Sequence, residues 1–158
     1  MFAARFNQDP EVATTLLKAG ADIKAQDNNG MTSLMFAAAF NPNPEVTTTL
    51  LRAGSDIKAE SKEGTTAPTY AAAGNPNPEV IATLLKAGAD INARDKSGLS
   101  MLLYAIMLNK NPDVITTLLK AGANAKKDSS GKTAFEWAQG RAELKGTDAL
   151  KQLEEASK

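Results

Sequence analysis

One phrase recurs along the 158-residue chain at a constant spacing. It reads NQDPEV at 7–12, NPNPEV at 41–46 and 75–80, and NKNPDV at 109–114, so each copy begins 34 residues after the last. A spacing of this size is the signature of a repeat protein, in which every repeat is one small supersecondary unit. This period constrains the fold more than any other feature of the chain.

Each copy of the phrase is predicted to be the turn between two short helices. It follows an Ala-rich run such as MTSLMFAAAF at 31–40 and leads into a segment with a Leu pair, such as PEVTTTLLRAG at 44–54. Asn43 is suited to cap the second helix, because its side chain accepts hydrogen bonds from free backbone N–H groups. Pro44 fits the first helical position. Gly54 fits the left-handed position just after the helix ends.

The Leu pairs predict that the copies stack side by side. Helices of about ten residues are marginal alone in water, and each copy carries apolar residues that have no partner within it. Burying a leucine stabilises a fold by about 1.5–3 kcal/mol. The pairs at 16–17, 50–51, 84–85 and 118–119 therefore favour a solenoid in which each unit contacts mainly its neighbours.

A unit with a Gly-x-Thr turn, an Ala-rich segment and then LLKAGADI resembles the ankyrin repeat. The resemblance covers nearly the whole chain. It implies an all-α fold: an ankyrin-repeat solenoid of stacked helix-turn-helix units with hairpin-like turns. We expect one array over residues 1–158, divided into a partial first repeat at 1–26, repeats at 27–60, 61–94 and 95–127, and a fifth repeat with a C-terminal cap at 128–158.

Three features depart from the usual ankyrin pattern or lie at the ends. Pro68 occupies a position where the family has leucine, which predicts a lost core side chain and a delayed helix start. Residues 1–6 match 35–40, so the chain begins inside a first helix; this indicates a fragment, an engineered chain or a differently built cap. Near the other end, Thr147 or Asp148 is expected to cap a last helix, and Trp137 to pack in the terminal seam.

Composition narrows the classes of function. Lys plus Arg and Asp plus Glu are both 18, so the chain lacks the net positive charge that draws proteins to nucleic acid or anionic membranes. Cysteine and histidine are absent, which excludes thiol chemistry and removes the commonest metal ligand and general base. We therefore expect no enzyme, no catalytic residue, no metal and no cofactor. Asp22, Asp56 and Asp90 are interpreted as turn-stabilising residues rather than metal ligands.

No signal peptide and no bilayer-spanning apolar run is visible in the sequence. We therefore expect a soluble protein, with a cytoplasmic location favoured.

The resemblance implies a concave face, made of turn tips and first helices, that binds another protein. Positions there differ between copies while the second helices are nearly identical, so packing does not dictate them. The candidate partner-binding residues are Asn28, Asn29, Met31, Phe40, Lys62, Glu63, Thr65, Lys96, Ser97, Leu99, Met107 and Leu108.

Two arrangements of the apolar candidates remain open. Phe6, Phe40 and Leu108 share one register, which Gly74 interrupts. Exposed side chains would form an apolar ridge of the kind that is enriched in interface cores. Alternatively, the extra residue in the helix-to-helix turn rotates them into the core between repeats.

A second function hypothesis is a structural scaffold, engineered, consensus-like or truncated, with no natural ligand. In that case an incomplete first repeat would leave Met1, Phe2, Leu16 and Leu17 partly uncovered and would favour self-association into a homo-oligomer.

Overall fold

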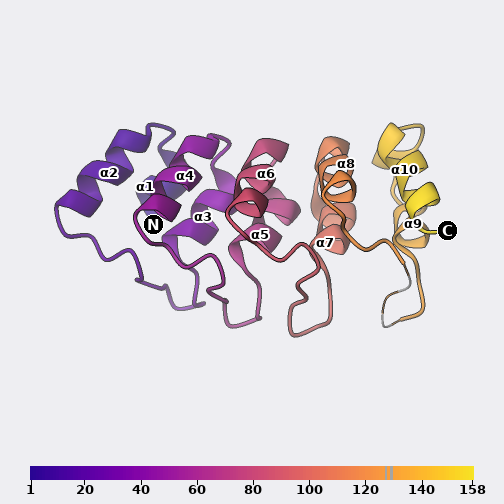
Figure 1. The fold of residues 1–158 in the computed structure, drawn as a ribbon, viewed down its shortest axis with the longest axis horizontal. Helices are drawn as coiled ribbons and strands as arrows, with labels where there is room; N and C mark the ends of the chain where they lie inside the picture. Colours follow the sequence, from indigo (N-terminus) through magenta and orange to yellow (C-terminus); the bar gives the residue numbers. More distant parts are fainter. Residues whose placement is uncertain (127, 129) are drawn as a thin grey trace.

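The computed structural model describes residues 1–126, 128 and 130–158, and these residues form a row of helix pairs that stand side by side from the N-terminus to the C-terminus (Figure 1). The first helices of the pairs are α1 (Phe2–Phe6), α3 (Ser33–Phe40), α5 (Ala67–Gly74), α7 (Met101–Leu108) and α9 (Ala134–Ala138). The second helices are α2 (Pro10–Lys18), α4 (Pro44–Arg52), α6 (Pro78–Lys86), α8 (Pro112–Lys120) and α10 (Asp148–Ala156). A 3-10 helix, η1 (Ala142–Leu144), joins the last two.

First helices pack on first helices and second helices on second helices along the whole stack, so the molecule has an inner and an outer layer. The loops that lead into α3, α5 and α7 each fold back through an isolated antiparallel bridge, as between Gln26 and Thr32. Among the described residues, no β-strand is longer than these single-residue bridges. The predicted all-α solenoid with hairpin-like turns is confirmed. The predicted boundary at residue 127 lies outside the described residues, as does residue 129 of the last turn.

The outer helices begin and end where the sequence predicts. Asn43 Oδ1 accepts a hydrogen bond from Glu45 N at 3.0 Å, and Asp9, Asn77 and Asn111 cap their helices in the same way. Pro44 is the first helical residue. Gly54 follows the last turn with φ of +93°, a left-handed backbone that glycine adopts without the strain a Cβ would bring.

The inner helix α5 corrects one prediction. It begins at Ala67, in register with Ser33 of α3, so Pro68 does not delay the helix start. Proline is accepted there because the N–H groups of the first helical turn have no partner within the helix in any case. Pro68 is itself buried and so fills the core position. The cap is weaker, since Thr66 makes no capping hydrogen bond.

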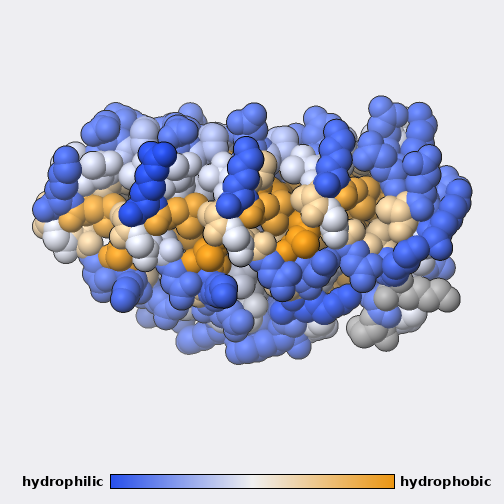
Figure 2. Space-filling view, viewed as in Figure 1, coloured by the Kyte–Doolittle hydropathy of each residue, from blue (hydrophilic) through white to orange (hydrophobic). Residues whose placement is uncertain are grey.

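The core runs through all repeats. Leu34, Leu50, Leu84 and Leu118 are buried, and the alanines of the inner helices allow these helices to lie close together. Apolar residues form a continuous band along the stack on the face seen in Figure 2, with hydrophilic residues above and below it. In the part of the chain that is described, no helix is long and apolar enough to span a membrane.

Asparagine side chains join one repeat to the next, which explains the recurring phrase. The amide nitrogen of the buried Asn75 donates to the carbonyl oxygens of Ala38 and Asn41, both at 2.8 Å, while its Oδ1 accepts from Asn77 N at 2.9 Å. Asn41 and Asn109 repeat this pattern toward the repeats that precede them. These three residues form what we term the asparagine ladder.

The capping asparagines add a second bond across each of the same interfaces. Asn77 Nδ2 donates to Pro42 O at 2.8 Å, and Asn43 and Asn111 make the equivalent bonds. The ladder stops in the last repeat, where Arg141 donates to Ile106 O instead. The phrases at 41–46, 75–80 and 109–114 thus each end one helix, cap the next and fasten their repeat to the previous one.

At the C-terminal end, Thr147 caps α10 by accepting from Leu150 N at 3.3 Å. Leu153 is buried, whereas Lys151, Glu154 and Glu155 are exposed, as expected for a cap with one apolar side.

Candidate partner-binding surface

The inner face consists of the first helices of each pair and the turn tips at 26–31, 60–65 and 94–99, and it corresponds to the predicted concave face. The tips are linked to one another: Lys62 N donates to Asn29 O at 2.9 Å, and Lys96 N donates to Glu63 O at 3.2 Å. Backbone bonds between neighbouring tips order the loops, so the residues they carry are held at a fixed spacing.

The polar candidates of the turn tips lie at the surface. Asn28, Asn29, Lys62, Glu63, Lys96 and Ser97 are all exposed. Met31 and Leu99 are partly buried and pack against the core. Thr65, by contrast, is buried, with its N–H bonded to Ser61 Oγ at 3.3 Å, so its side chain does not reach a partner. The register of Thr65 matches that of Met31, but the shorter side chain stays beneath the tip.

The open question about the apolar candidates is resolved by burial. Phe6 is 65% exposed, Phe40 46% and Leu108 54%, so they do not lie in the core between repeats. We call these three residues the apolar row. Met107 beside them is half-buried. The guanidinium carbon of Arg5 lies 4.8 Å from the ring centre of Phe6 and 4.1 Å from that of Phe40, a cation–π arrangement that holds both rings.

Gly74 leaves a gap in the apolar row. A cavity of about 320 Å³ opens there, lined by Ala73, Gly74, Pro76, Leu108, Asn109 and Lys110. The apolar row therefore has a hollow at Gly74, with the exposed side chains of Phe40 and Leu108 on either side of it.

A second set of residues on the inner face was missed in the sequence. Phe2, Phe36, Tyr70, Tyr104 and Trp137 occupy one register, each one helical turn before the apolar row. We call this set the aromatic column. Its rings reach toward the row: the ring centres of Phe2 and Phe6 are 6.1 Å apart, and those of Phe36 and Phe40 are 6.4 Å apart. The steps of 34, 34, 34 and 33 residues between its members, which follow the repeats, were the signal that could have found it.

In the last two repeats the aromatic column is tied to the turn tips. Tyr104 OH donates to Asp95 Oδ2 at 2.6 Å, and Trp137 Nε1 donates to Asp128 Oδ2 at 2.8 Å. Burial, together with the bond to Asp95, raises the pKa of Tyr104 to about 12. Hydrogen bonds from Ser130 and Trp137 lower the pKa of Asp128 to about 2. Trp137 also packs against the core, as expected for the terminal repeat.

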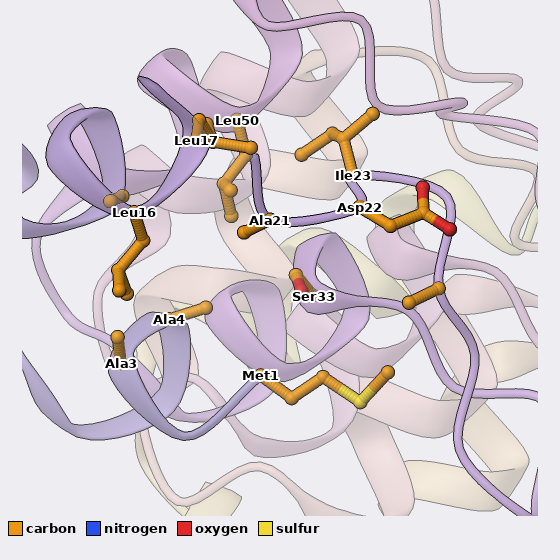
Figure 3. Close-up of a pocket in the computed structure, with 12 residues that line it drawn as sticks. Met1, Ala3, Ala4, Leu16, Leu17, Ala21, Asp22, Ile23, Ser33 and Leu50 are labelled. Atoms are coloured by element: carbon orange, nitrogen blue, oxygen red, sulfur yellow. The ribbon is translucent and has the colours of Figure 1, made fainter. Parts of the chain in front are cut away.

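The first repeat contains an apolar cavity of about 260 Å³ between α1, α2 and the loop that follows α2 (Figure 3). In the figure, Leu16 and Leu17 lie above it, Ala3 and Ala4 at its lower left, Ser33 on its right and Met1 at the bottom. Met1 matches Met35 and Leu103 in register, and the residues just before these two, Leu34 and Leu102, are buried. Of the apolar residues predicted to be uncovered, Phe2 is 83% exposed and Leu16 46%, while Met1 and Leu17 are partly buried.

The repeated aspartates serve the turns. Asp22, Asp56 and Asp90 each accept a hydrogen bond from the backbone N–H two residues later, at 2.8, 2.8 and 2.9 Å. Among the described residues, no group of three or more metal-ligating side chains is close enough together to hold a metal ion.

A family model described as ankyrin repeats (3 copies) matches residues 1–95 and again residues 69–153. A comparison with curated proteins gives no match.

Proposed function

Because the chain belongs to the ankyrin-repeat family, we propose that it is a non-catalytic module that binds another protein on its inner face. Ankyrin repeats are generally protein–protein interaction modules, and the family is typically non-catalytic. The observation that carries the proposal for this face is the exposure of the apolar row. Phe40 and Leu108 end helices whose other residues are largely buried, so their exposure is not a by-product of a polar, solvated helix.

The surroundings of the row fit a partner interface. Interfaces combine an apolar centre, rich in aromatic residues and methionine, with a polar rim. Here the aromatic column and Met107 adjoin the row, and the exposed tip residues Asn28, Lys62, Glu63, Lys96 and Ser97 supply polar groups on one side. Met31 and Leu99 end their turn tips and pack against the core, so they lie between the polar tip residues and the first helices.

A displayed random-peptide library, selected against the folded protein, tests the proposal. Peptides that bind should lose at least about tenfold in affinity for the double variant Phe40→Ala, Leu108→Ala, because truncating a central apolar anchor typically costs more than 1 kcal/mol. Both side chains lie at the surface, so unfolding temperatures should change little. Leu16→Ala is the matched control, since Leu16 is as exposed as Phe40 but lies on outer helix α2. Undiminished binding by the double variant would remove the apolar row from the interface.

A second candidate function is a structural scaffold that has no separate ligand and associates with a second copy through its first repeat. The apolar cavity beside Leu16 and the exposed ring of Phe2 favour it, since uncovered apolar surface promotes association. Sedimentation of the wild type should then show dimers that Leu16→Glu converts to monomers. A monomer at high concentration contradicts this candidate.

A further inference from the structure

A second cavity on the inner face combines aromatic walls with two unsatisfied polar atoms. It measures about 250 Å³ and is lined by Met1, Phe2, Arg5, Asp27 and Phe36. Phe2 and Phe36 are successive members of the aromatic column. The volume lies below the range of about 300–1,000 Å³ typical of drug-sized ligands, so the cavity suits a single side chain better than a cofactor.

Asp27 presents an unused acceptor at this cavity. Its Oδ1 accepts from Asn29 N and Met31 N, both at 2.8 Å, which holds the turn tip. The equivalent Oδ1 of Asp95 accepts from Ser97 N and Leu99 N at 2.9 Å. The other oxygen differs between the two repeats. Asp95 Oδ2 is bonded to Tyr104 OH, whereas among the described residues Asp27 Oδ2 has no donor.

The difference follows from one atom in the aromatic column. Tyr104 stands nine residues after Asp95 and Trp137 nine after Asp128, and both bring a polar hydrogen to the carboxylate. Phe36 stands nine residues after Asp27 but has no such hydrogen. The fourth and fifth repeats therefore satisfy their own aspartates, and the second repeat leaves its aspartate open at the cavity.

Arg5 supplies the second unsatisfied atom. Its Nε is buried and, in the part of the chain that is described, has no hydrogen-bond partner. The stacking of the guanidinium between Phe6 and Phe40 fixes the side chain in this position. The two rings leave the Nε out of reach of a ligand, so Arg5 contributes a fixed positive charge beside the cavity rather than a hydrogen bond.

We propose that this cavity receives a tyrosine side chain of the partner. A phenol can donate to Asp27 Oδ2, as that of Tyr104 does to Asp95 Oδ2, whereas a phenylalanine ring has no polar hydrogen to donate. Its ring lies against Phe2 and Phe36, as aromatic rings do when they stack or meet edge to face. The partner tyrosine thus repeats at Asp27 the bond that Tyr104 makes at Asp95. The inference rests on the proposed function and names the side chain that this part of the inner face selects.

The direct test compares N-acetyl-tyrosinamide with N-acetyl-phenylalaninamide, which lack all other partner contacts. Binding is followed by NMR through the backbone amides of Asn29 and Met31, which are bonded to the same carboxylate. The tyrosine probe should bind about tenfold more tightly, the effect expected of hydrogen bonds to charged groups. N-acetyl-tryptophanamide, whose indole N–H also donates but whose ring is larger, should fall between the two. Equal affinity for the tyrosine and phenylalanine probes would overturn the proposal.

Two variants test the same atoms from the protein side. Phe36→Tyr should bring its own phenol to Asp27, as Tyr104 does to Asp95, and so reduce the affinity for the tyrosine probe to that for the phenylalanine probe. Asp27→Asn keeps the Oδ1 acceptor that the turn needs but replaces Oδ2 with a donor, and it should have the same effect. Tyr70→Phe is the control, because it changes one oxygen elsewhere in the column and should leave binding unchanged. Full tyrosine-probe affinity in a folded Phe36→Tyr variant would contradict the proposal.

Library-selected peptides separate this inference from the proposed function. If Phe40→Ala, Leu108→Ala weakens their binding and Phe36→Tyr does not, the inner face binds partners but the tyrosine cavity is wrong. If both variants weaken binding, and the selected peptides share a tyrosine, the two proposals stand together. If neither variant weakens it, both proposals fail.

Discussion

The side-chain nitrogen of Asn75 lies 2.8 Å from the carbonyl oxygen of Asn41, the residue at the same position one repeat earlier. Both residues are fully buried. One amide thereby serves two repeats, since it fastens its own turn through Asn77 and the preceding turn through Asn41.

The first prediction concerns this contact. Asn75→Ala should lower the free energy of unfolding by roughly 3 kcal/mol, because two buried carbonyl oxygens and the N–H of Asn77 lose their partner at once. Asn7→Ala is the matched control at the same register. Asn7 is exposed and, among the described residues, its side chain accepts from Asp9 N alone, so the loss should stay below about 1 kcal/mol. Equal losses in urea unfolding would show that the bonds between repeats contribute little.

The second prediction separates backbone strain from close contact at two glycines. Gly54 and Gly64 both have positive φ, +93° and +78°, so alanine should destabilise either site by about 1–2 kcal/mol. At Gly54 an added Cβ would meet no atom within 4 Å, whereas at Gly64 it would lie 2.8 Å from Lys96 Cγ and 3.1 Å from Lys96 N. Gly64→Ala should therefore cost more, and thermal unfolding of the two variants measures the difference. Identical unfolding temperatures would mean that the tips do not pack as described.

The third prediction is an acid transition confined to the last repeat. The pKa of Asp128 is lowered to about 2 from an ordinary 3.8, so its hydrogen bonds stabilise the fold above pH 3.8 and are lost as the pH falls toward 2. Trp137 donates to Asp128 and is the one tryptophan of the sequence, so its fluorescence reports the loss. We expect the emission of Trp137 to change between pH 4 and pH 2. Asp128→Asn should remove this titration, and an unaltered pH profile in that variant would contradict the assignment.

The fourth prediction concerns the cavity in the first repeat. A copy of residues 27–34 joined ahead of Met1 places a leucine where Leu34 lies in its own repeat. Burial of that leucine should raise the free energy of unfolding by about 1.5–3 kcal/mol. The control carries the same extension with asparagine as its last residue, which adds equal chain length without apolar burial. Similar gains from both extensions would show that the cavity is not a leucine site.

Local features of the fold were predictable because their causes lie within a few residues. Asn43 caps its own helix and Gly54 ends it, and both requirements are visible in the twelve residues 43–54. The role of Asn41 was not predictable from the sequence. Its partners lie 34 and 37 residues away and contact it only when the repeats stack. A sequence shows that this residue recurs but not where its amide points.

The candidate site was predictable in part for the same reason. Register placed Phe40 and Leu108 in one row, yet whether they faced solvent depended on the rotation of the inner helices. Thr65 and Met31 share a register but not an exposure, because side-chain length decides which of them leaves the tip. The identity of Asp27 does not show that its Oδ2 lacks a donor. That depends on Phe36, which stands where Tyr104 stands relative to Asp95.

The asparagine ladder runs in one direction, with each amide donating toward the N-terminus. An interior repeat therefore accepts hydrogen bonds from the following repeat and donates equivalent ones to the preceding repeat. A tandem duplicate of such a repeat would make the same bonds to both neighbours. Gain or loss of whole repeats can thus change the length of the molecule. The same change alters the size of the partner surface that it can contact. Substitutions at the turn tips can then change the partner that is bound, while the asparagine ladder between repeats stays the same.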